Sequence, residues 1–257
     1  MRIIDIGCNL GSSRLYRNYQ EICENAKKAG VIAQIITGSD TLSNEIALNL
    51  ANQEDFLYAT IGFHPHNADD WKPSLISQHL AALKNPRVVA VGELGLDYFR
   101  KLSKIANQKT CFSKQLELAE EIKKPLFLHE REAFDDFKRI LTPYLKNLSG
   151  VWHCFTANYE QLKWALDKGL YIGITGWIAD PVRGLELQKI VKEIPNDRLL
   201  IETDAPYLTP KTLKPLPKIN EPKYLVEVLR VISQCRNQDI EELGELTFNN
   251  TKKLFRL

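Results

Sequence analysis

The fold of this chain is decided by the stretch Leu199-Leu200-Ile201-Glu202-Thr203-Asp204-Ala205-Pro206-Tyr207. Its apolar start is typical of a buried strand, because a parallel strand that is covered on both faces is apolar throughout. Ala205-Pro206 ends the regular structure, since proline fixes its own φ and restricts the residue before it. We therefore expect Asp204 at the carboxyl end of a core strand, where a carboxylate has little structural purpose.

Seven further apolar runs of similar length precede this one. Helical patterns separate most of them, and Gly30 and Gly169 end two of these helices. Eight alternations of strand and helix predict an α/β fold, a TIM barrel of eight parallel strands with outer helices. The eight runs are Ile3–Ile6, Ala33–Thr37, Leu57–Gly62, Val88–Gly92, Leu126–His129, Gly150–His153, Leu170–Thr175 and Leu199–Thr203.

Length and composition describe an ordinary globular chain. The 257 residues suit one barrel domain, which we expect to span residues 1–257. No apolar run approaches the ~18 residues of a membrane helix, and a signal peptide is not expected. The five cysteines are scattered and predict reduced thiols in the cytoplasm. The net charge of +2 argues against coating of nucleic acid by global charge but allows a local basic cleft.

Polar side chains of the metal-ligand type lie at the carboxyl ends of these runs. In a parallel barrel those ends meet on one face, where active sites are built. Two imidazoles and two carboxylates suit a divalent cation, and the predicted ligands are Glu93, His129, His153 and Asp204. The cation would lower the pKa of a bound water from about 15.7 toward about 7. Asp204 would also act as the general base for that water.

Further polar residues at these ends receive other roles. His64, His66 and Arg131 are candidates to bind the phosphate oxygens of a substrate. Taken singly, each histidine is better explained as a hydrogen-bonded structural residue, and it is the joint placement that favours a metal site. Asp97 would line the mouth of the site or cap the next segment, and we expect His79 on the surface of a helix.

Aromatic and basic residues in the loops after the strands are candidates to bind a single strand of nucleic acid. Such strands are usually bound by a basic groove with stacked aromatic rings. The alternative is that the rings pack the loops and the cations are solvated. The candidates are Tyr98, Phe155, Trp177 and Tyr207, with Lys101, Lys104, Arg183, Lys211 and Lys218.

The motifs around these residues resemble those of the TatD-related metal-dependent deoxyribonucleases, a branch of the amidohydrolase superfamily. Two segments, Gly173–Trp177 and Arg183–Leu187, resemble the TatD subgroup itself. The resemblance covers essentially the whole chain and rests on motifs in the same order: Asp5–Leu10, Gly62–His66, Gly92–Asp97, Leu128–Arg131, His153–Thr156, Glu202–Tyr207 and Asn250–Phe255.

This resemblance implies a distorted TIM barrel, a divalent metal and cleavage of phosphodiester bonds in DNA. For the TatD subgroup it implies a cytoplasmic 3′ to 5′ exonuclease that prefers single-stranded DNA, uses Mg²⁺ and is associated with DNA repair. The residues themselves leave Mn²⁺ or Zn²⁺ open as the metal and RNA open as a substrate. We expect a monomer that does not bind membranes.

One departure concerns the residues after the first run. Most of the wider family carries a His-x-His pair there that binds one of two metals, whereas this chain has Gly7 and Asn9. Glycine has no side-chain ligand and an asparagine carbonyl is a weak one. The TatD subgroup shares the change, so the number of ions, one or two, stays open.

Two competing functions belong to other classes. One is a metal-dependent hydrolase of another ester or an amide, because this barrel hosts many chemistries. A lysine at the end of the fourth or fifth run would favour it, and Glu93 and His129 stand there instead. The other is a non-catalytic nucleic-acid-binding module stabilised by metal, which would have no need of Asp204 as a base.

Overall fold

All eight predicted strands are present in the computed structural model, which describes residues 1–257. They form one parallel sheet in chain order, so the predicted TIM-barrel fold is confirmed. The strands are β1 (Ile3–Cys8), β2 (Val31–Ile36), β3 (Leu57–Ile61), β4 (Val88–Asp97), β5 (Leu126–Arg131), β6 (Gly150–Trp152), β7 (Tyr171–Ile174) and β8 (Leu199–Ile201).

Helices follow the strands, as the alternating pattern predicts. The α-helices are α1 (Tyr19–Lys28), α2 (Thr41–Gln53), α3 (Ile76–Leu83), α4 (Ile105–Ile122), α5 (Phe134–Leu141), α6 (Tyr159–Asp167), α7 (Leu185–Ile190), α8 (Leu225–Arg236) and α9 (Ile240–Phe255). Short 3₁₀ turns are η1 (Tyr16–Asn18), η2 (Pro65–Asn67), η3 (Pro73–Leu75), η4 (Tyr144–Lys146), η5 (Gly176–Ala179), η6 (Val191–Glu193), η7 (Asn196–Arg198) and η8 (Pro222–Tyr224). None of the helices is long and apolar enough to cross a membrane.

The contacts divide the chain into two compact units. Unit 1 comprises Met1–Ile36, His153–Asp167 and Tyr171–Leu257, and unit 2 comprises Thr37–Trp152 and Lys168–Leu170. The single domain over residues 1–257 stays a prediction. No disulfide joins any of the cysteines, as expected for reduced thiols.

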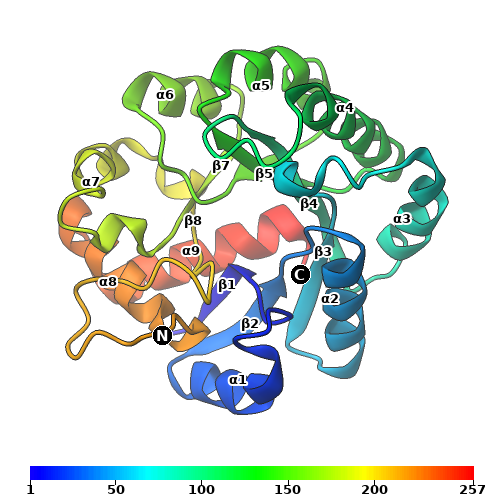
Figure 1. Ribbon diagram of the computed structural model, residues 1–257. Coiled ribbons are helices and arrows are strands. Elements are labelled where there is room, and N and C mark those ends of the chain that lie inside the picture. Colours follow the sequence, from blue (N-terminus) through cyan, green and yellow to red (C-terminus); the bar gives the residue numbers. More distant parts are fainter. The chain divides into compact units, whose positions relative to one another are not determined.

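In unit 2, α2 packs against β3, and α3 and α4 pack against β4 (Figure 1). The inward face of α4 carries Phe112, Leu116 and Ala119, all fully buried, at the helical spacing that predicts an apolar face. His79 contradicts the prediction of a surface residue: it is 4% exposed, and its ring lies 5.4 Å from that of Phe63. The reason is that His79 and the buried Leu83 are four residues apart and share one face of α3.

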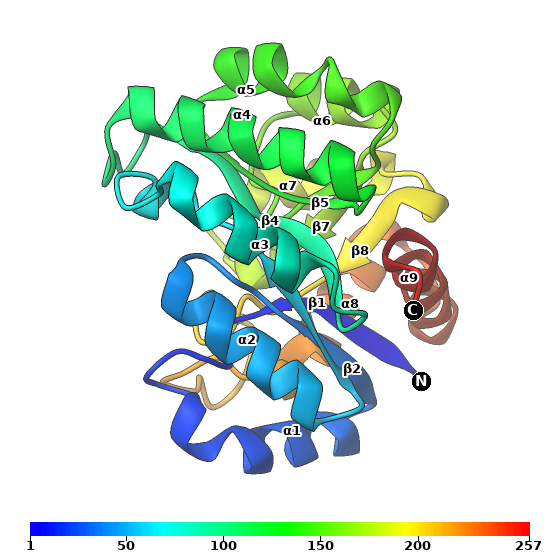
Figure 2. The same ribbon diagram turned by 90° about the vertical axis from the view of Figure 1, so that its right-hand side faces the viewer.

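In unit 1, α9 packs against β1 and β8, as Figure 2 shows. Asn158 and Gln161 form a capping box before α6, because the side chain of Asn158 accepts from the Gln161 N–H and the Gln161 side chain accepts from the Asn158 N–H. The proline-rich segment from Lys211 to Pro222 contains no α-helix.

Two strands extend further than the apolar runs indicate. β4 continues to Asp97 with all ten residues buried, and β5 continues to Arg131. Glu93 and His129 therefore lie within strands rather than just after them. The apolar runs underestimate these strands because the polar residues of the site interrupt the hydrophobic pattern.

Candidate active site

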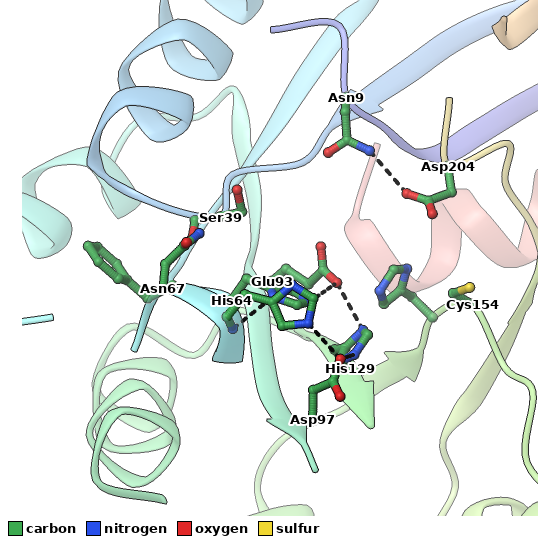
Figure 3. Close-up of polar contacts among 12 residues, drawn as sticks. Asn9, Ser39, His64, Asn67, Glu93, Asp97, His129, Cys154 and Asp204 are labelled. Atoms are coloured by element: carbon green, nitrogen blue, oxygen red, sulfur yellow. Dashed lines mark hydrogen bonds and ion pairs between the residues drawn. The ribbon is translucent and has the colours of Figure 1, made fainter. Parts of the chain in front are cut away.

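Three side chains of unit 2, which we call the histidine cluster, converge: His64 follows β3, Glu93 lies within β4 and His129 lies within β5. Glu93 Oε1 lies 3.2 Å from His64 Nε2 and 3.1 Å from His129 Nδ1 (Figure 3). One ligand atom from each residue falls within 4.8 Å of the other two, which is close enough to share a metal ion. All three side chains are largely withdrawn from solvent.

The backbone of β4 aims Glu93 into this cluster. The register with β5 shifts between Gly92 and Leu94, so Glu93 is an extra, bulged residue, and such bulges redirect a side chain. The flanking Gly92 and Gly95 have φ values of +152° and +149°. A Cβ atom at Gly95 would lie 1.8 Å from the His129 carbonyl oxygen, so glycine is needed for the close approach of the two strands.

The loop before His64 is fixed by buried carboxamides. Gln115 Oε1 accepts from the Phe63 N–H at 2.7 Å, and Gln115 Nε2 donates to the Phe63 carbonyl at 3.0 Å. Asn44 binds both backbone groups of Gly62 in the same way. These bonds leave the His64 ring little freedom of position.

Hydrogen bonding determines which nitrogen of His64 carries the proton. The His66 N–H donates to His64 Nδ1 at 3.0 Å, so the neutral ring carries its proton on Nε2. Burial lowers the pKa of His64 to about 4, against the opposing effect of Glu93, so the ring is neutral at pH 7. His64 Nε2 is therefore a hydrogen-bond donor. It suits an anionic oxygen, such as that of a carboxylate or phosphate, better than a metal ion.

A second carboxylate, Asp97, lies beside the cluster. Asp97 Oδ2 lies 2.6 Å from His66 Nε2 and 3.6 Å from His129 Nε2, while Oδ1 accepts from two N–H groups of the following turn. Burial alone would raise the pKa of Asp97, but the neighbouring His129 and His66 imidazoles hold that pKa well below its ordinary value. Asp97 thus both lines the site and caps the next segment, the two roles that the sequence left open.

Asp204, in unit 1, follows β8 on a segment tied to the first strand. Its N–H donates to the Gly7 carbonyl at 2.8 Å, and Asn9 Nδ2 donates to Asp204 Oδ1 at 3.0 Å (Figure 3). The φ of Asp204 is +54°, a left-handed conformation that aspartate tolerates better than most residues. The amide of Asn9 therefore orients the carboxylate, a role that the weakness of asparagine as a ligand had not suggested.

His153, also in unit 1, comes directly after β6 and is paired with a buried glutamate. His153 Nδ1 lies 3.3 Å from Glu202 Oε2, and the Cys154 N–H donates to Glu202 Oε1 at 2.5 Å. A carboxylate accepts hydrogen bonds and donates none, so the His153 proton lies on Nδ1. This leaves Nε2 with the lone pair that a metal ligand needs.

A buried acid supports the segment before Asp204. Asp5 accepts from the Thr203 N–H at 2.9 Å and lies 2.5 Å from Thr203 Oγ1. Burial raises the pKa of Asp5 from 3.8 to about 8, although the bonds to Thr203 oppose this. Asp5 is therefore protonated at neutral pH, and the Thr203 hydroxyl donates to its Oδ2.

A family described as TatD related DNase matches residues 4–256. The chain belongs to the TatD-related DNase family.

Relatives within this TatD-related family support the assignment over the full length. The "3'-5' ssDNA/RNA exonuclease TatD" of Erwinia billingiae is 42% identical, with 99% of each chain covered. The protein of the same name from Edwardsiella piscicida is 44% identical, covering 99% of this chain and 100% of its own. The crystal structure of YJJV, a TatD homolog from Escherichia coli, shares 28% identity with a TM-score of 0.92, covering 100% of this chain and 98% of that one.

The structure places the predicted site residues of this TatD-related chain in three groups. Glu93 and His129 are in contact within unit 2, while His153 and Asp204 belong to unit 1. Among the predicted phosphate-binding residues, His64 contacts Glu93 and His66 contacts Asp97. Arg131 pairs with Asp97 in the β4–β5 register, and its guanidinium carbon lies 4.0 Å from the centre of the Phe99 ring.

Several residues that support the site were not assigned a role from the sequence. Glu202 lies two residues before Asp204 in the stretch quoted first, but its partner His153 is 49 residues away in the sequence. Gln108 and Gln115 had a visible signal, because they are polar residues on the apolar face of α4. Gln108 binds the backbone N–H and carbonyl of Asp97, as Gln115 does for Phe63.

Proposed function

We propose that this chain is a metal-dependent 3′ to 5′ exonuclease that hydrolyses phosphodiester bonds of single-stranded DNA, and also of RNA. The observation that carries the proposal is the full-length match to relatives named as ssDNA/RNA exonucleases. The donor set in the two units is consistent with it, because imidazole and carboxylate groups suit a divalent cation. Action in the cytoplasm, as a monomer and in DNA repair, belongs to the same proposal and rests on the family resemblance.

We propose Glu93, His129, His153 and Asp204 as the metal ligands and Mg²⁺ as the metal, with Mn²⁺ or Zn²⁺ as alternatives. The chemistry of the groups supports the choice. Glu93 and His129 face one another, and Glu202 leaves His153 Nε2 unprotonated. Because residues 7 and 9 supply no strong ligand, we favour a single ion. When bound, such an ion acidifies a water and polarises a phosphate oxygen.

The remaining residues act on the substrate and on the attacking water. Asp204 accepts the proton of the water as the general base, and Asn9 holds its carboxylate in position. His64 Nε2–H donates to a non-transferred phosphate oxygen, which its tautomer favours over metal binding. His66 and Arg131 are the other two proposed phosphate-binding residues. The Arg131 side chain would have to leave its contact with Phe99.

The alternative of an amide or ester hydrolase gains no support from these residues. It predicts a lysine on β4 or β5 that could be carbamylated to bind metal, and those strands carry Glu93 and His129. A substrate panel separates the possibilities: single-stranded DNA, duplex DNA, RNA and a phosphodiester reporter, each with and without a chelator. Loss of all activity with chelator and preference for single strands are the expected results.

Asp204→Asn tests the general base. The variant keeps an oxygen that can accept from Asn9, so we expect the same fold and thermal unfolding but at least about a hundredfold lower hydrolysis of single-stranded DNA. Asp55→Asn is the matched control, because the Asp55 side chain is fully exposed in another region and its loss leaves activity unchanged. Unchanged turnover in Asp204→Asn would refute the assignment.

A further inference from the structure

Tyr207, like Tyr159, differs in its environment from the other exposed aromatic residues. Its side chain is 53% exposed and contacts neither another ring nor a cation. By contrast, the exposed Tyr16 stacks on Tyr19 at 6.1 Å, and Phe99 lies beneath the Arg131 guanidinium. The ring of Tyr207 thus presents apolar faces that the fold itself does not use.

The backbone of Tyr207 is held on both sides. Its N–H donates to the Asp204 carbonyl at 2.9 Å, and Asn220 Nδ2 donates to the Tyr207 carbonyl at 2.6 Å. The next residue, Leu208, lies against Gly176. A Cβ atom added to Gly176 would lie 2.0 Å from the backbone carbonyl oxygen of Leu208. A ring presented from such a fixed backbone loses little freedom on binding a ligand.

The same turn places Tyr207 next to the proposed general base. The bond from the Tyr207 N–H to the Asp204 carbonyl closes a four-residue turn. The two Cα atoms of such a turn are within about 7 Å of one another. A phosphate attacked beside Asp204 therefore brings the base of an adjoining nucleotide within reach of the ring.

The other aromatic candidates of unit 1 are already engaged. Phe155 is fully buried, so its prediction as a stacking residue is wrong. One face of Trp177 is covered by the Arg183 guanidinium at 4.3 Å, and its Nε1 donates to the Arg183 carbonyl. Arg183 is itself paired with Asp180, as is Lys211. These residues form a fixed loop, and Tyr207 is left with its ring available.

We propose that Tyr207 is a nucleobase-stacking site that binds a base of the single-stranded substrate beside the scissile phosphate. The proposal rests on the nuclease function proposed above. An aromatic face stacks on any base, so the contact gives affinity without sequence preference. A base inside a duplex is already stacked on its neighbours, so the site favours single strands.

The test compares two short single strands whose 3′ linkages are phosphorothioates, which resist cleavage, in the presence of Mg²⁺. One strand carries normal thymines, and in the other the last two 3′ nucleotides are abasic. The wild-type protein should bind the normal strand about tenfold more tightly, as expected for loss of a stacked base. Tyr207→Phe keeps this preference, whereas Tyr207→Ala and Tyr207→Leu lose it.

The choice of variants separates stacking from packing. Leucine keeps the apolar bulk of residue 207 without an aromatic face, so equal preference in Tyr207→Leu and the wild type would overturn the proposal. Absence of any base preference in the wild type would overturn it as well. If the wild-type protein neither binds nor cleaves single strands, it is the nuclease function that fails. Active enzyme with an undiminished preference in Tyr207→Ala refutes the stacking site alone.

Discussion

The two units hold their functional side chains with different chemistry. In unit 2, neutral carboxamides of Asn44, Gln115 and Gln108 bind the backbone on either side of the histidine cluster. In unit 1, the segment before Asp204 is held by a carboxyl group, that of Asp5. Asn220 supplements it by donating to the Thr203 carbonyl at 2.9 Å.

This difference matters because a carboxamide and a carboxyl group respond differently to pH. A glutamine donates and accepts at once at any pH, so Gln115 satisfies both backbone groups of Phe63 without titrating. Asp5 accepts from the Thr203 N–H and hydroxyl, but burial disfavours its ionised form, which the folded protein must hold above about pH 8. The support of the histidine cluster should therefore be insensitive to pH, whereas that of Asp204 should weaken as pH rises.

The largest expected effect concerns Asp5→Asn. The pKa of Asp5 rises from 3.8 to about 8 on folding, so between these values the folded protein retains a proton that the unfolded chain has lost. Asp5 therefore makes stability fall as pH rises, by about 1.4 kcal/mol for each pH unit at most. Asparagine reproduces the protonated acid and removes this slope. Chemical denaturation of both proteins from pH 5 to pH 8 measures it.

The expected result is that the difference in stability between the two proteins is smallest at pH 5 and that Asp5→Asn is progressively more stable toward pH 8. The control Asp197→Asn changes an exposed carboxylate of unit 1 and should leave the slope as it is. Parallel pH profiles for the wild type and Asp5→Asn would show that Asp5 is ionised in the folded protein. The proposed contrast between the units would then be lost.

The next effect tests the carboxamide side of the comparison. Gln115→Leu leaves the N–H and carbonyl of Phe63 buried without their partner, which we expect to destabilise the protein by about 3 kcal/mol. The loss should be the same at pH 5 and pH 8, unlike that of Asp5. Gln20→Leu is the matched control, an exposed helical glutamine whose replacement changes stability by about 0.5 kcal/mol or less. A strongly pH-dependent loss in Gln115→Leu would contradict this account.

The sequence was sufficient to predict the fold because strand and helix periodicity is a local property. Each predicted apolar run corresponds to a strand, and helices follow most of the strands as the alternation predicts. The carboxyl end of β4 was missed because Glu93 and Gly95 interrupt its apolar pattern. Their effect on the strand becomes clear only from the bulge and from the close approach to β5.

The site was less predictable, because its side chains are oriented by partners that are distant in the sequence. The resemblance supplied the ligand types, but the tautomer of His64 depends on a single bond from the His66 N–H. His79 was misassigned because one histidine at a helical spacing gives no indication of which face is buried. Glu202 was passed over for the same reason, since its function depends on His153.

The smallest expected effect concerns Glu202→Gln in unit 1. Glu202 is the second acidic residue of this unit that holds a functional residue, here His153. Glu202 Oε1 accepts from the Cys154 N–H and Oε2 from His153 Nδ1. In Glu202→Gln, the carboxamide oxygen continues to accept from the Cys154 N–H, so the NH₂ group faces His153 Nδ1. Because this group donates, Nδ1 becomes the acceptor and the His153 proton moves to Nε2. We expect metal affinity and activity to fall tenfold to hundredfold, which is about the loss typical of such positioning residues.

Nitrogen-15 spectra of the metal-free protein report the tautomer directly: Nδ1–H in the wild type and Nε2–H in the variant. If the variant keeps its proton on Nδ1, any loss of activity has another cause, and Glu202 does not position the ring.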